Sequence, residues 1–256
     1  MSILKETATV VSQKEISKDI YDMTIAFPAG AKEAKPGQFL AIYCKGGQRL
    51  LPRPISICGI DSQAGTLRIV YRIQGAGTKE ISTWKAGDQF EIMGPLGNGF
   101  TPKKNRAILI GGGIGVPPML ELAKQMDGEK TMIMGYRDKD NMFLKEEFEK
   151  LGEVKIATDD GSYGVHGTVV DAIREYEVSG DTIYACGPMP MLKALAAYAQ
   201  EHNMEAQISL EERMACGIGA CLGCITKSKS KDHHTNVNNK RICKEGPVFD
   251  AKEVVF

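Results

Sequence analysis

The residues with the clearest chemistry are four of the seven cysteines, which lie near the C-terminus at Cys216, Cys221, Cys224 and Cys243. The first three follow the spacing C-x4-C-x2-C, and the fourth comes from further along the chain. This is the ligand spacing of a [2Fe–2S] cluster, in which one tight loop supplies three thiolates. Gly217, Gly219 and Gly223 lie between the ligands, and glycine lets backbone N–H groups turn toward sulfur. The cysteines therefore predict a site that carries single electrons.

A zinc site is the main alternative use of these cysteines. Cys221 and Cys224 form a C-x2-C pair, and two histidines, His233 and His234, follow it before the last cysteine, so they could supply zinc ligands. Such a site leaves Cys216 without a role. Disulfides require an oxidising compartment, and the N-terminal sequence lacks the layout of an export signal. We therefore favour the iron–sulfur cluster.

The composition argues against several classes of function. The chain has 256 residues, of which 43% are hydrophobic, enough for about two domains with sizeable cores. Lys plus Arg and Asp plus Glu both number 32, so nucleic-acid binding and membrane-surface binding have no electrostatic support. Apolar runs such as 107–110 are too short to span a bilayer. We expect a cytoplasmic protein, since clustered cysteines there more often bind metal than form disulfides.

Residues 1–101 are predicted to form a six-stranded antiparallel barrel. Short β-prone runs separated by glycine and proline cover 7–11, 19–27, 38–44, 55–58, 66–73 and 89–94. A short helix is expected over 78–84, because Thr78 is a good N-cap and Glu80 falls in the first turn.

Residues 102–206 are predicted to form a doubly wound parallel sheet. Strand-like runs at 107–110, 130–135, 154–158 and 181–185 alternate with helical segments at 117–126, 143–151, 168–176 and 188–202. This alternation is typical of α/β domains with helices on both faces. A last strand-like run at 205–210 leads into a small C-terminal domain, residues 207–256, that holds the cysteines. Its polar 227–240 stretch is expected to be a solvated excursion.

Two segments of the predicted barrel could bind an anion. The tetrapeptide Arg53-Pro54-Ile55-Ser56 offers an arginine fork for a pyrophosphate and a hydroxyl for a flat heterocycle. The segment Gly75-Ala76-Gly77-Thr78 lets a ligand approach the backbone closely, just before a helix N-terminus. Alone, Arg53 could be a surface residue beside a turn proline. Together the two segments favour a dinucleotide or flavin phosphate.

The second domain carries a glycine loop between a predicted strand and helix. Gly111, Gly113 and Gly115 belong to it, and from Gly113 the pattern is G-x-G-x-x-P, with Pro118 in place of a third glycine. Backbone amides and the helix dipole would face a phosphate there, although a tight turn is the alternative. Cys186 ends the strand at 181–185, at the sheet edge where ligands bind. The alternative for Cys186 is a buried structural cysteine.

These segments occur in the order seen in the ferredoxin–NADP reductase superfamily. They are Arg53-Pro54-Ile55-Ser56, Gly77-Thr78, Gly94-Pro95-Leu96-Gly97, the 111–118 loop and Cys186-Gly187-Pro188. With the C-terminal cysteines, essentially the whole chain resembles the electron-transfer subunits of NAD-dependent (class B) dihydroorotate dehydrogenases. The order of the motifs together with the cluster spacing is highly specific. One departure is the long segment between Cys224 and Cys243, whose excess falls in the polar 227–240 stretch.

The resemblance implies the cofactors and the residues that hold them. FAD would bind the barrel, with Arg53 on its pyrophosphate, Ser56 near the flavin, and Gly77 and Thr78 at the phosphates. The cofactor would also be lined by Pro54, Ile55, Val70, Tyr71 and Arg72. NAD(H) would bind the second domain as co-substrate, at Gly111, Gly113, Gly115, Asp159 and Cys186.

The resemblance also implies a partner. The cluster would lie between this FAD and an FMN in a separate catalytic subunit that oxidises dihydroorotate to orotate in pyrimidine biosynthesis, in a heterotetramer with two copies of each subunit. No acid–base residue is then needed in this chain, and electrons would leave on NAD⁺. Asp159 and Asp160 follow a predicted strand where the ribose is expected, and carboxylates would repel a 2′-phosphate. NAD is therefore favoured over NADP, unless these residues merely form a polar turn with Gly161.

Two other functions stay open. Similar flavin and [2Fe–2S] subunits serve NADH-dependent ferredoxin:NADP oxidoreductases and sulfide dehydrogenases, and the local motifs barely separate them. A zinc-stabilised binding protein with a nucleotide-binding fold belongs to another class, and it would be colourless when purified.

Overall fold

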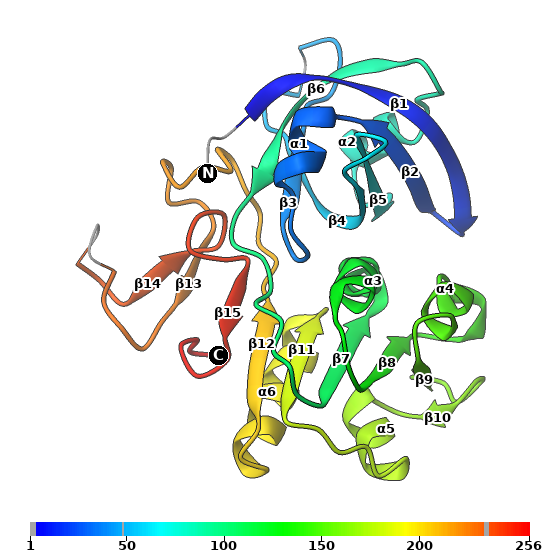
Figure 1. Cartoon of the computed structure of the whole chain (residues 1–256). Helices are drawn as coiled ribbons and strands as arrows, with labels where there is room; N and C mark the ends of the chain where they lie inside the picture. Colours follow the sequence, from blue (N-terminus) through cyan, green and yellow to red (C-terminus); the bar gives the residue numbers. More distant parts are fainter. Residues whose placement is uncertain (1–3, 48, 233–235) are drawn as a thin grey trace.

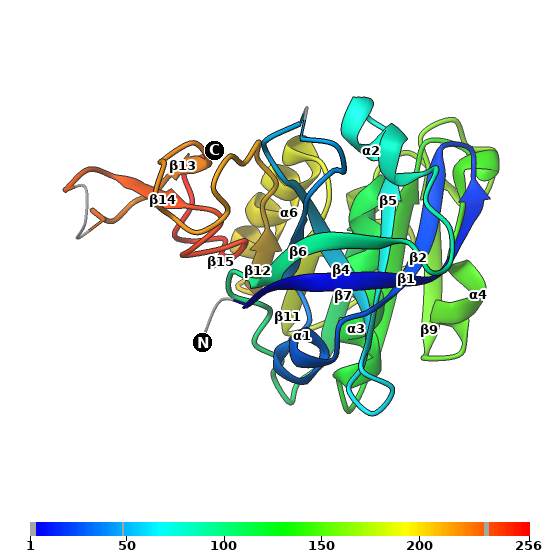
Figure 2. The same cartoon turned by 90° about the horizontal axis from the view of Figure 1, so that it is seen from above.

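The computed structural model describes residues 4–47, 49–232 and 236–256. Figure 1 shows the barrel above the α/β sheet, with the C-terminal segment packed alongside both. Figure 2 shows the same arrangement from above, where β13 and β14 extend away from the barrel and the sheet. The sheet and the barrel meet along a junction, and the C-terminal segment lies at its side.

Within the described residues, six antiparallel strands close into a barrel in the order β1-β2-β5-β4-β3-β6. Their bounds are Leu4–Ser17 (β1), Ile20–Ala26 (β2), Phe39–Ile42 (β3), Arg53–Asp61 (β4), Thr66–Arg72 (β5) and Gln89–Leu96 (β6). Apolar side chains fill the barrel, and Ile25, Leu40, Ile57 and Ile69 are completely buried. The predicted six-stranded barrel is confirmed. Because its interior is packed, a cofactor must bind at its outer surface.

Two short helices accompany the barrel, α1 (Pro28–Glu33) and α2 (Ala76–Ile81). The predicted start of α2 was wrong, because Gly75 is the N-cap and Thr78 is the third helical residue. The Thr78 hydroxyl accepts hydrogen bonds from the backbone N–H groups of Gln74 at 2.9 Å and Gly75 at 3.3 Å. A side chain that reaches back in this way stabilises the helix start from inside the first turn.

The second domain is a seven-stranded sheet, as far as the chain is described, in the order β10-β9-β8-β7-β11-β12-β15. The strands are β7 (Ala107–Gly112), β8 (Lys130–Tyr136), β9 (Glu153–Thr158), β10 (Val165–His166), β11 (Thr182–Cys186), β12 (Glu205–Ser209) and β15 (Val248–Asp250). Neighbouring strands from β10 to β12 are parallel, and β15 runs antiparallel to β12. The strand order reverses between β7 and β11. The ligand-binding crevice is therefore expected at the carboxyl ends of these two strands.

Helices cover both faces of the sheet, so the doubly wound architecture is confirmed. They are α3 (Val116–Gln125), α4 (Lys145–Glu149), α5 (Val169–Glu175) and α6 (Met189–Glu201), with 3-10 turns η1 (Gly113–Gly115) and η2 (Lys139–Asn141). Successive residues of β7 enter different cores. Leu109 packs with residues of α3 and α4, whereas Ile108 and Ile110 pack with residues of α5 and α6.

The C-terminal segment is less independent than its polarity indicates. Strands β13 (Ile225–Lys227) and β14 (Asn239–Arg241) pair antiparallel and flank the predicted polar excursion. The described residues of that excursion are largely exposed, apart from Ser228. The chain then returns through β15 to the edge of the α/β sheet. This return ties the cysteine-bearing segment to the nucleotide-binding domain.

Candidate functional site

A cavity of about 250 Å³ lies at the junction of barrel and sheet. Residues predicted for the flavin site line it, namely Arg53, Pro54, Ile55, Ser56, Val70, Tyr71, Arg72 and Thr78. The sheet and the segment after β12 complete the wall with Ile114, Glu211, Glu212 and Met214, which the sequence had not indicated as part of this site. The structure thus brings two separate barrel motifs and the C-terminal segment around one space.

The arginine of this cavity is seated against the glycine of α2. A Cβ atom placed on Gly77 would lie 2.5 Å from Cζ of Arg53, which is inside the van der Waals limit. The Arg53 Nη1 group also donates a hydrogen bond to the carbonyl oxygen of Leu51. The absence of a side chain at Gly77 therefore lets a cationic fork lie close to backbone. This donor set, with the nearby Ser56 and Thr78 hydroxyls, fits the pyrophosphate of FAD.

Tyr71 is held rigidly beside this cavity. Its hydroxyl donates a hydrogen bond of 2.8 Å to Oε1 of Gln13, and its ring stacks on Tyr21 with centroids 5.9 Å apart. The Gln13 amide in turn donates to the carbonyl oxygens of Ile81 at 3.1 Å and Trp84 at 2.9 Å. Burial raises the pKa of Tyr71, so the phenol stays neutral. Tyr71 is 2% exposed and packs within the barrel core, so it stiffens the barrel wall that borders this cavity.

A second cavity of about 730 Å³ opens at the carboxyl ends of the parallel strands. It is lined by the predicted residues Gly113 and Asp159 and by Arg137, Met191 and Arg72. Arg72 also lines the first cavity, so the two spaces adjoin at this side chain. Arg137 was not predicted, although it follows β8 at the same edge at which Asp159 follows β9.

Gly111 and Gly115 serve close packing of the loop. A Cβ atom on Gly111 would lie 2.7 Å from Cα of Val116, and one on Gly115 would lie 2.5 Å from the carbonyl carbon of Cys186. The Cys186 side chain is completely buried, and among the described lining residues it belongs to neither cavity. Burial raises the pKa of the Cys186 thiol, which keeps it neutral. Its contact with a bound nicotinamide stays a prediction.

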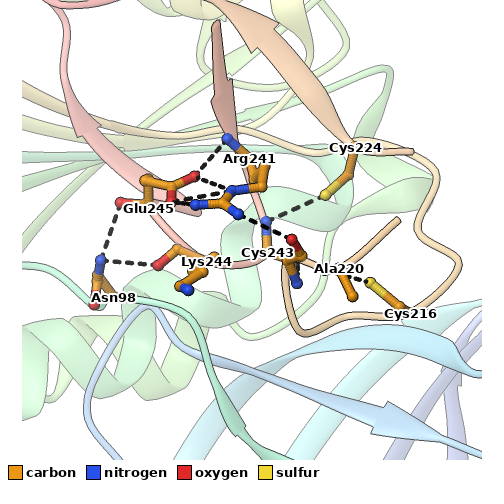
Figure 3. A network of polar contacts seen from close by, with 9 residues as sticks. Asn98, Cys216, Ala220, Cys224, Arg241, Cys243, Lys244 and Glu245 are labelled. Carbon is orange, nitrogen blue, oxygen red and sulfur yellow. Dashed lines mark hydrogen bonds and ion pairs between the residues drawn. The ribbon is translucent and has the colours of Figure 1, made fainter. Parts of the chain in front are cut away.

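Each of the four predicted cluster sulfurs accepts a backbone hydrogen bond, and two of these bonds are drawn in Figure 3. Gly219 N–H donates to Cys243 at 3.1 Å, and Ala220 N–H donates to Cys216 at 3.3 Å. Gly223 N–H donates to Cys221 and Cys243 N–H donates to Cys224, both at 3.4 Å. Such donors stabilise thiolates and suit the electron-rich sulfurs of a cluster.

The thiols form two pairs. Burial raises the pKa of the Cys216 thiol, but hydrogen bonds from backbone N–H groups and from Cys221 outweigh it and lower the value to about 6. Burial and the neighbouring Cys224 raise the pKa of Cys243 to about 12. In the described part of the chain, no group of three or more His, Cys, Asp or Glu side chains is arranged to hold one metal ion. Two pairs of thiols fit a [2Fe–2S] cluster, in which two thiolates hold each iron.

The histidines considered as zinc ligands, His233 and His234, lie outside the described residues. The pairs of thiols differ in exposure, because Cys224 and Cys243 are buried whereas Cys221 is exposed and Cys216 is intermediate. One edge of the site therefore faces the outside of the molecule.

The cluster loop adjoins the flavin cavity. Met214 lines that cavity, and Cys216 follows it almost at once in the chain. The loop also packs on β6, since a Cβ atom on Gly217 would lie 3.5 Å from Cδ1 of Leu96 and 3.6 Å from Cε of Met93.

No helix among the described residues has the length and apolarity needed to cross a membrane.

Three family models match the chain in succession. An oxidoreductase FAD-binding domain matches residues 7–100, and an oxidoreductase NAD-binding domain matches residues 109–197. The iron–sulfur cluster binding domain of dihydroorotate dehydrogenase B matches residues 211–255. The cofactors inferred from the motifs, FAD, NAD(H) and the cluster, are thereby confirmed at the level of the domains that bind them.

A solved NADH-dependent reduced ferredoxin–NADP oxidoreductase, studied for flavin-based electron bifurcation, superposes with a TM-score of 0.86 and 29% identity over 96% of this chain and 89% of that one. The FAD/NAD-binding domain of a nitric oxide dioxygenase from Vibrio cholerae O1 biovar El Tor has a TM-score of 0.67 at 17% identity, covering 79% of this chain and 97% of that one. At that identity the likeness shows the fold alone.

Relatives of nearly equal length carry one name, dihydroorotate dehydrogenase B (NAD(+)), electron transfer subunit. The protein from Geobacillus thermodenitrificans is 42% identical and covers 98% of this chain and 99% of its own length. The protein from Caldanaerobacter subterraneus subsp. tengcongensis is 44% identical with the same coverage. The chain therefore belongs to the family of dihydroorotate dehydrogenase B (NAD(+)) electron transfer subunits.

Proposed function

We propose that this chain passes electrons between a dihydroorotate-oxidising partner and NAD⁺ in pyrimidine biosynthesis. The observation that carries the proposal is the contiguity of the three sites. Arg72 lines both the flavin and the nicotinamide cavity, and Met214 joins the flavin cavity to the cysteine loop. When bound, the flavin would exchange hydride with NAD(H) and single electrons with the cluster. Neither NAD(H) nor the cluster can carry out both kinds of transfer.

The residues of this chain then have defined tasks. Arg53 and Thr78 would hold the FAD pyrophosphate beside Gly77, and Ser56 and Tyr71 would orient the ring. The nicotinamide nucleotide would lie over Gly113, with Asp159 near the ribose. Cys216 and Cys221 would hold one iron, and Cys224 and Cys243 the other. We assign residues 1–101, 102–206 and 207–256 to the FAD, NAD and cluster domains.

The partner we propose is an FMN-containing dihydroorotate dehydrogenase catalytic subunit, in a cytoplasmic heterotetramer with two copies of each chain. The family name of the relatives, "electron transfer subunit", supports the existence of such a partner. The exposure of Cys221 supports docking at the cluster edge, beside the polar 227–240 stretch. An exposed ligand there keeps the distance to a second cofactor short.

Co-purification tests the proposal. The tagged chain is expressed in the organism that it comes from, and the proteins bound to it are identified together with their cofactors. We expect an FMN protein to co-purify and the complex to reduce NAD⁺ when dihydroorotate is added. A complex that contains FAD and iron but does not oxidise dihydroorotate would overturn the proposal.

A second candidate is a subunit of an NADH-dependent ferredoxin:NADP oxidoreductase. The superposition on such an enzyme over nearly the whole chain favours it. In that case the co-purified protein would be a larger flavin- and cluster-rich subunit, and the complex would reduce ferredoxin and NADP⁺ rather than oxidise dihydroorotate.

A further inference from the structure

An ion pair between a buried arginine and a partly exposed glutamate lies beside the cluster cysteines (Figure 3). Arg241, on β14, is 6% exposed, and its Nε donates to both carboxylate oxygens of Glu245, at 3.1 and 3.0 Å. The backbone N–H of Arg241 donates to the same carboxylate at 2.7 Å. Arg241 and Glu245 are four residues apart, and Cys243 lies between them in the chain. Both charges are therefore held next to a cluster ligand.

The other end of the guanidinium reaches the cysteine loop. Nη1 of Arg241 donates a hydrogen bond of 3.0 Å to the carbonyl oxygen of Gly219. That carbonyl belongs to the same peptide unit as the N–H of Ala220, which donates to the Cys216 sulfur at 3.3 Å. Hydrogen bonds linked through one peptide polarise each other. The positive charge of Arg241 is therefore connected to a cluster sulfur by one peptide plane.

Gly219 also contacts the second pair of thiols, Cys224 and Cys243. Gly219 donates its own N–H to the Cys243 sulfur at 3.1 Å, so a shift of Gly219 would disturb hydrogen bonds to both iron positions. The Glu245 end is anchored in turn by Asn98, whose Nδ2 donates to the carbonyl oxygens of Lys244 at 3.2 Å and Glu245 at 3.0 Å. Asn98 follows β6, so the pair is tied to the flavin barrel as well.

We propose that Arg241 is a positioning residue of the [2Fe–2S] site and that the Arg241–Glu245 pair sets the reduction potential of the cluster. This inference rests on the cluster site proposed above. Reduction adds one negative charge to the cluster. The buried guanidinium of Arg241 stabilises that charge with little screening by water, and the Glu245 carboxylate, whose side chain is 25% exposed, opposes it. The residues that orient the ligands of a metal site also tune the metal in this way.

The two charges give opposite expectations. Arg241→Gln should shift the midpoint potential of the cluster to more negative values, whereas Glu245→Gln should shift it to more positive values. Arg241→Lys keeps the charge and should stay nearer the wild type than Arg241→Gln. We expect each charge removal to change the one-electron reduction equilibrium about tenfold, which corresponds to about 59 mV. The potentials are read from a redox titration of the holo protein followed by EPR.

Lys240→Gln is the matched control. Lys240 is the neighbour of Arg241 on β14, and successive strand residues point to opposite faces. Its Nζ pairs with Glu253 at 2.6 Å on that other face. The substitution likewise replaces one positive charge with a neutral glutamine, and it should leave the potential near that of the wild type.

The outcomes separate this inference from the proposed function. A wild-type protein without iron–sulfur absorbance or an EPR signal would overturn the cluster itself. A wild-type cluster whose potential responds to Arg241→Gln and Glu245→Gln no more than to Lys240→Gln, or with the same sign in both, would overturn the role of the ion pair alone. If Arg241→Gln fails to retain iron, the shift of Glu245→Gln relative to Lys240→Gln still decides whether the charges of the pair act on the cluster.

Discussion

The guanidinium of Arg53 occupies the space that a side chain on Gly77 would need. A Cβ atom at position 77 would lie 2.5 Å from Cζ and 2.6 Å from Nη2 of Arg53. Arg53 begins β4 and Gly77 lies in α2, so the two segments can form one anion site only because residue 77 is glycine.

We therefore expect Gly77→Ala to displace Arg53 and to weaken FAD binding. A loss of one charge-assisted contact corresponds to about tenfold in affinity, or about 1.4 kcal/mol. The flavin content of the purified protein and the dissociation constant for added FAD measure it. Gly75→Ala is the control, because no described atom lies within 4 Å of a Cβ atom placed there. Equal flavin retention by the two variants would contradict the role of the Arg53–Gly77 contact.

Cys221→Ser should separate the two halves of the electron path. Cys221 is the exposed thiol of the site, and a serine hydroxyl is a poor ligand for iron in a sulfur site. We expect NADH oxidation by artificial acceptors, which needs only FAD and the nicotinamide site, to persist while transfer from the partner is abolished. Cys44→Ser, outside the cysteine loop, should leave both activities intact. Survival of both activities in Cys221→Ser would place the cluster off the path.

Asp159 should make the protein prefer NADH to NADPH. Its carboxylate lines the cavity at the end of β9, where it would repel a 2′-phosphate. Since Arg137 lines the same cavity, Asp159→Asn leaves a cation there, and kcat/KM for NADPH should rise about tenfold. The control is Asp160→Asn, because Asp160 accepts the N–H of Ser162 at 2.9 Å within the turn. Equal kcat/KM values for NADH and NADPH in the wild type would rule out the proposed selectivity.

An ion triad joins the barrel to the nucleotide-binding domain. Arg68 on β5 pairs with Asp22 on β2 at 2.7 Å and with Glu147 on α4 at 2.6 Å. The hydrogen bonds from Arg68 lower the pKa of the Glu147 carboxyl. A lowered pKa in the folded state stabilises the protein above the unfolded-state pKa, and this contribution is lost as pH falls through the folded-state value.

Glu147→Gln should thus reduce the free energy of unfolding at neutral pH by about 1 kcal/mol, a modest value because Glu147 is partly exposed and screened. For a chain of this size the melting temperature should fall by about 2–4 °C. Glu146→Gln, at the exposed neighbouring position, is the control. The difference between wild type and Glu147→Gln should shrink as pH is lowered below the usual glutamate range. A difference that grows on acidification would show that the carboxylate charge is not stabilising.

The sequence alone determined the parts of this protein that depend on local pattern. The spacing from Cys216 to Cys224 was sufficient to predict a cluster loop, since its ligands are neighbours in the chain. Most strands and helices of both large domains followed from hydrophobic periodicity and from glycine and proline between them, although α1 and β10 were not predicted. The start of α2 was misplaced, because Thr78 can cap a helix from within the first turn as well as from its N-cap.

The tertiary structure alone decided which distant residues meet. Arg72 adjoins both cavities, and Met214 and Glu211 close the flavin cavity from a segment that shows no local sign of it. The short strands β10 and β15 carry too few residues for a detectable period. The contact of Arg241 with the carbonyl oxygen of Gly219 likewise depends on the chain returning through β14. Local pattern fixes which element forms, but contacts between elements arise only when the whole chain packs.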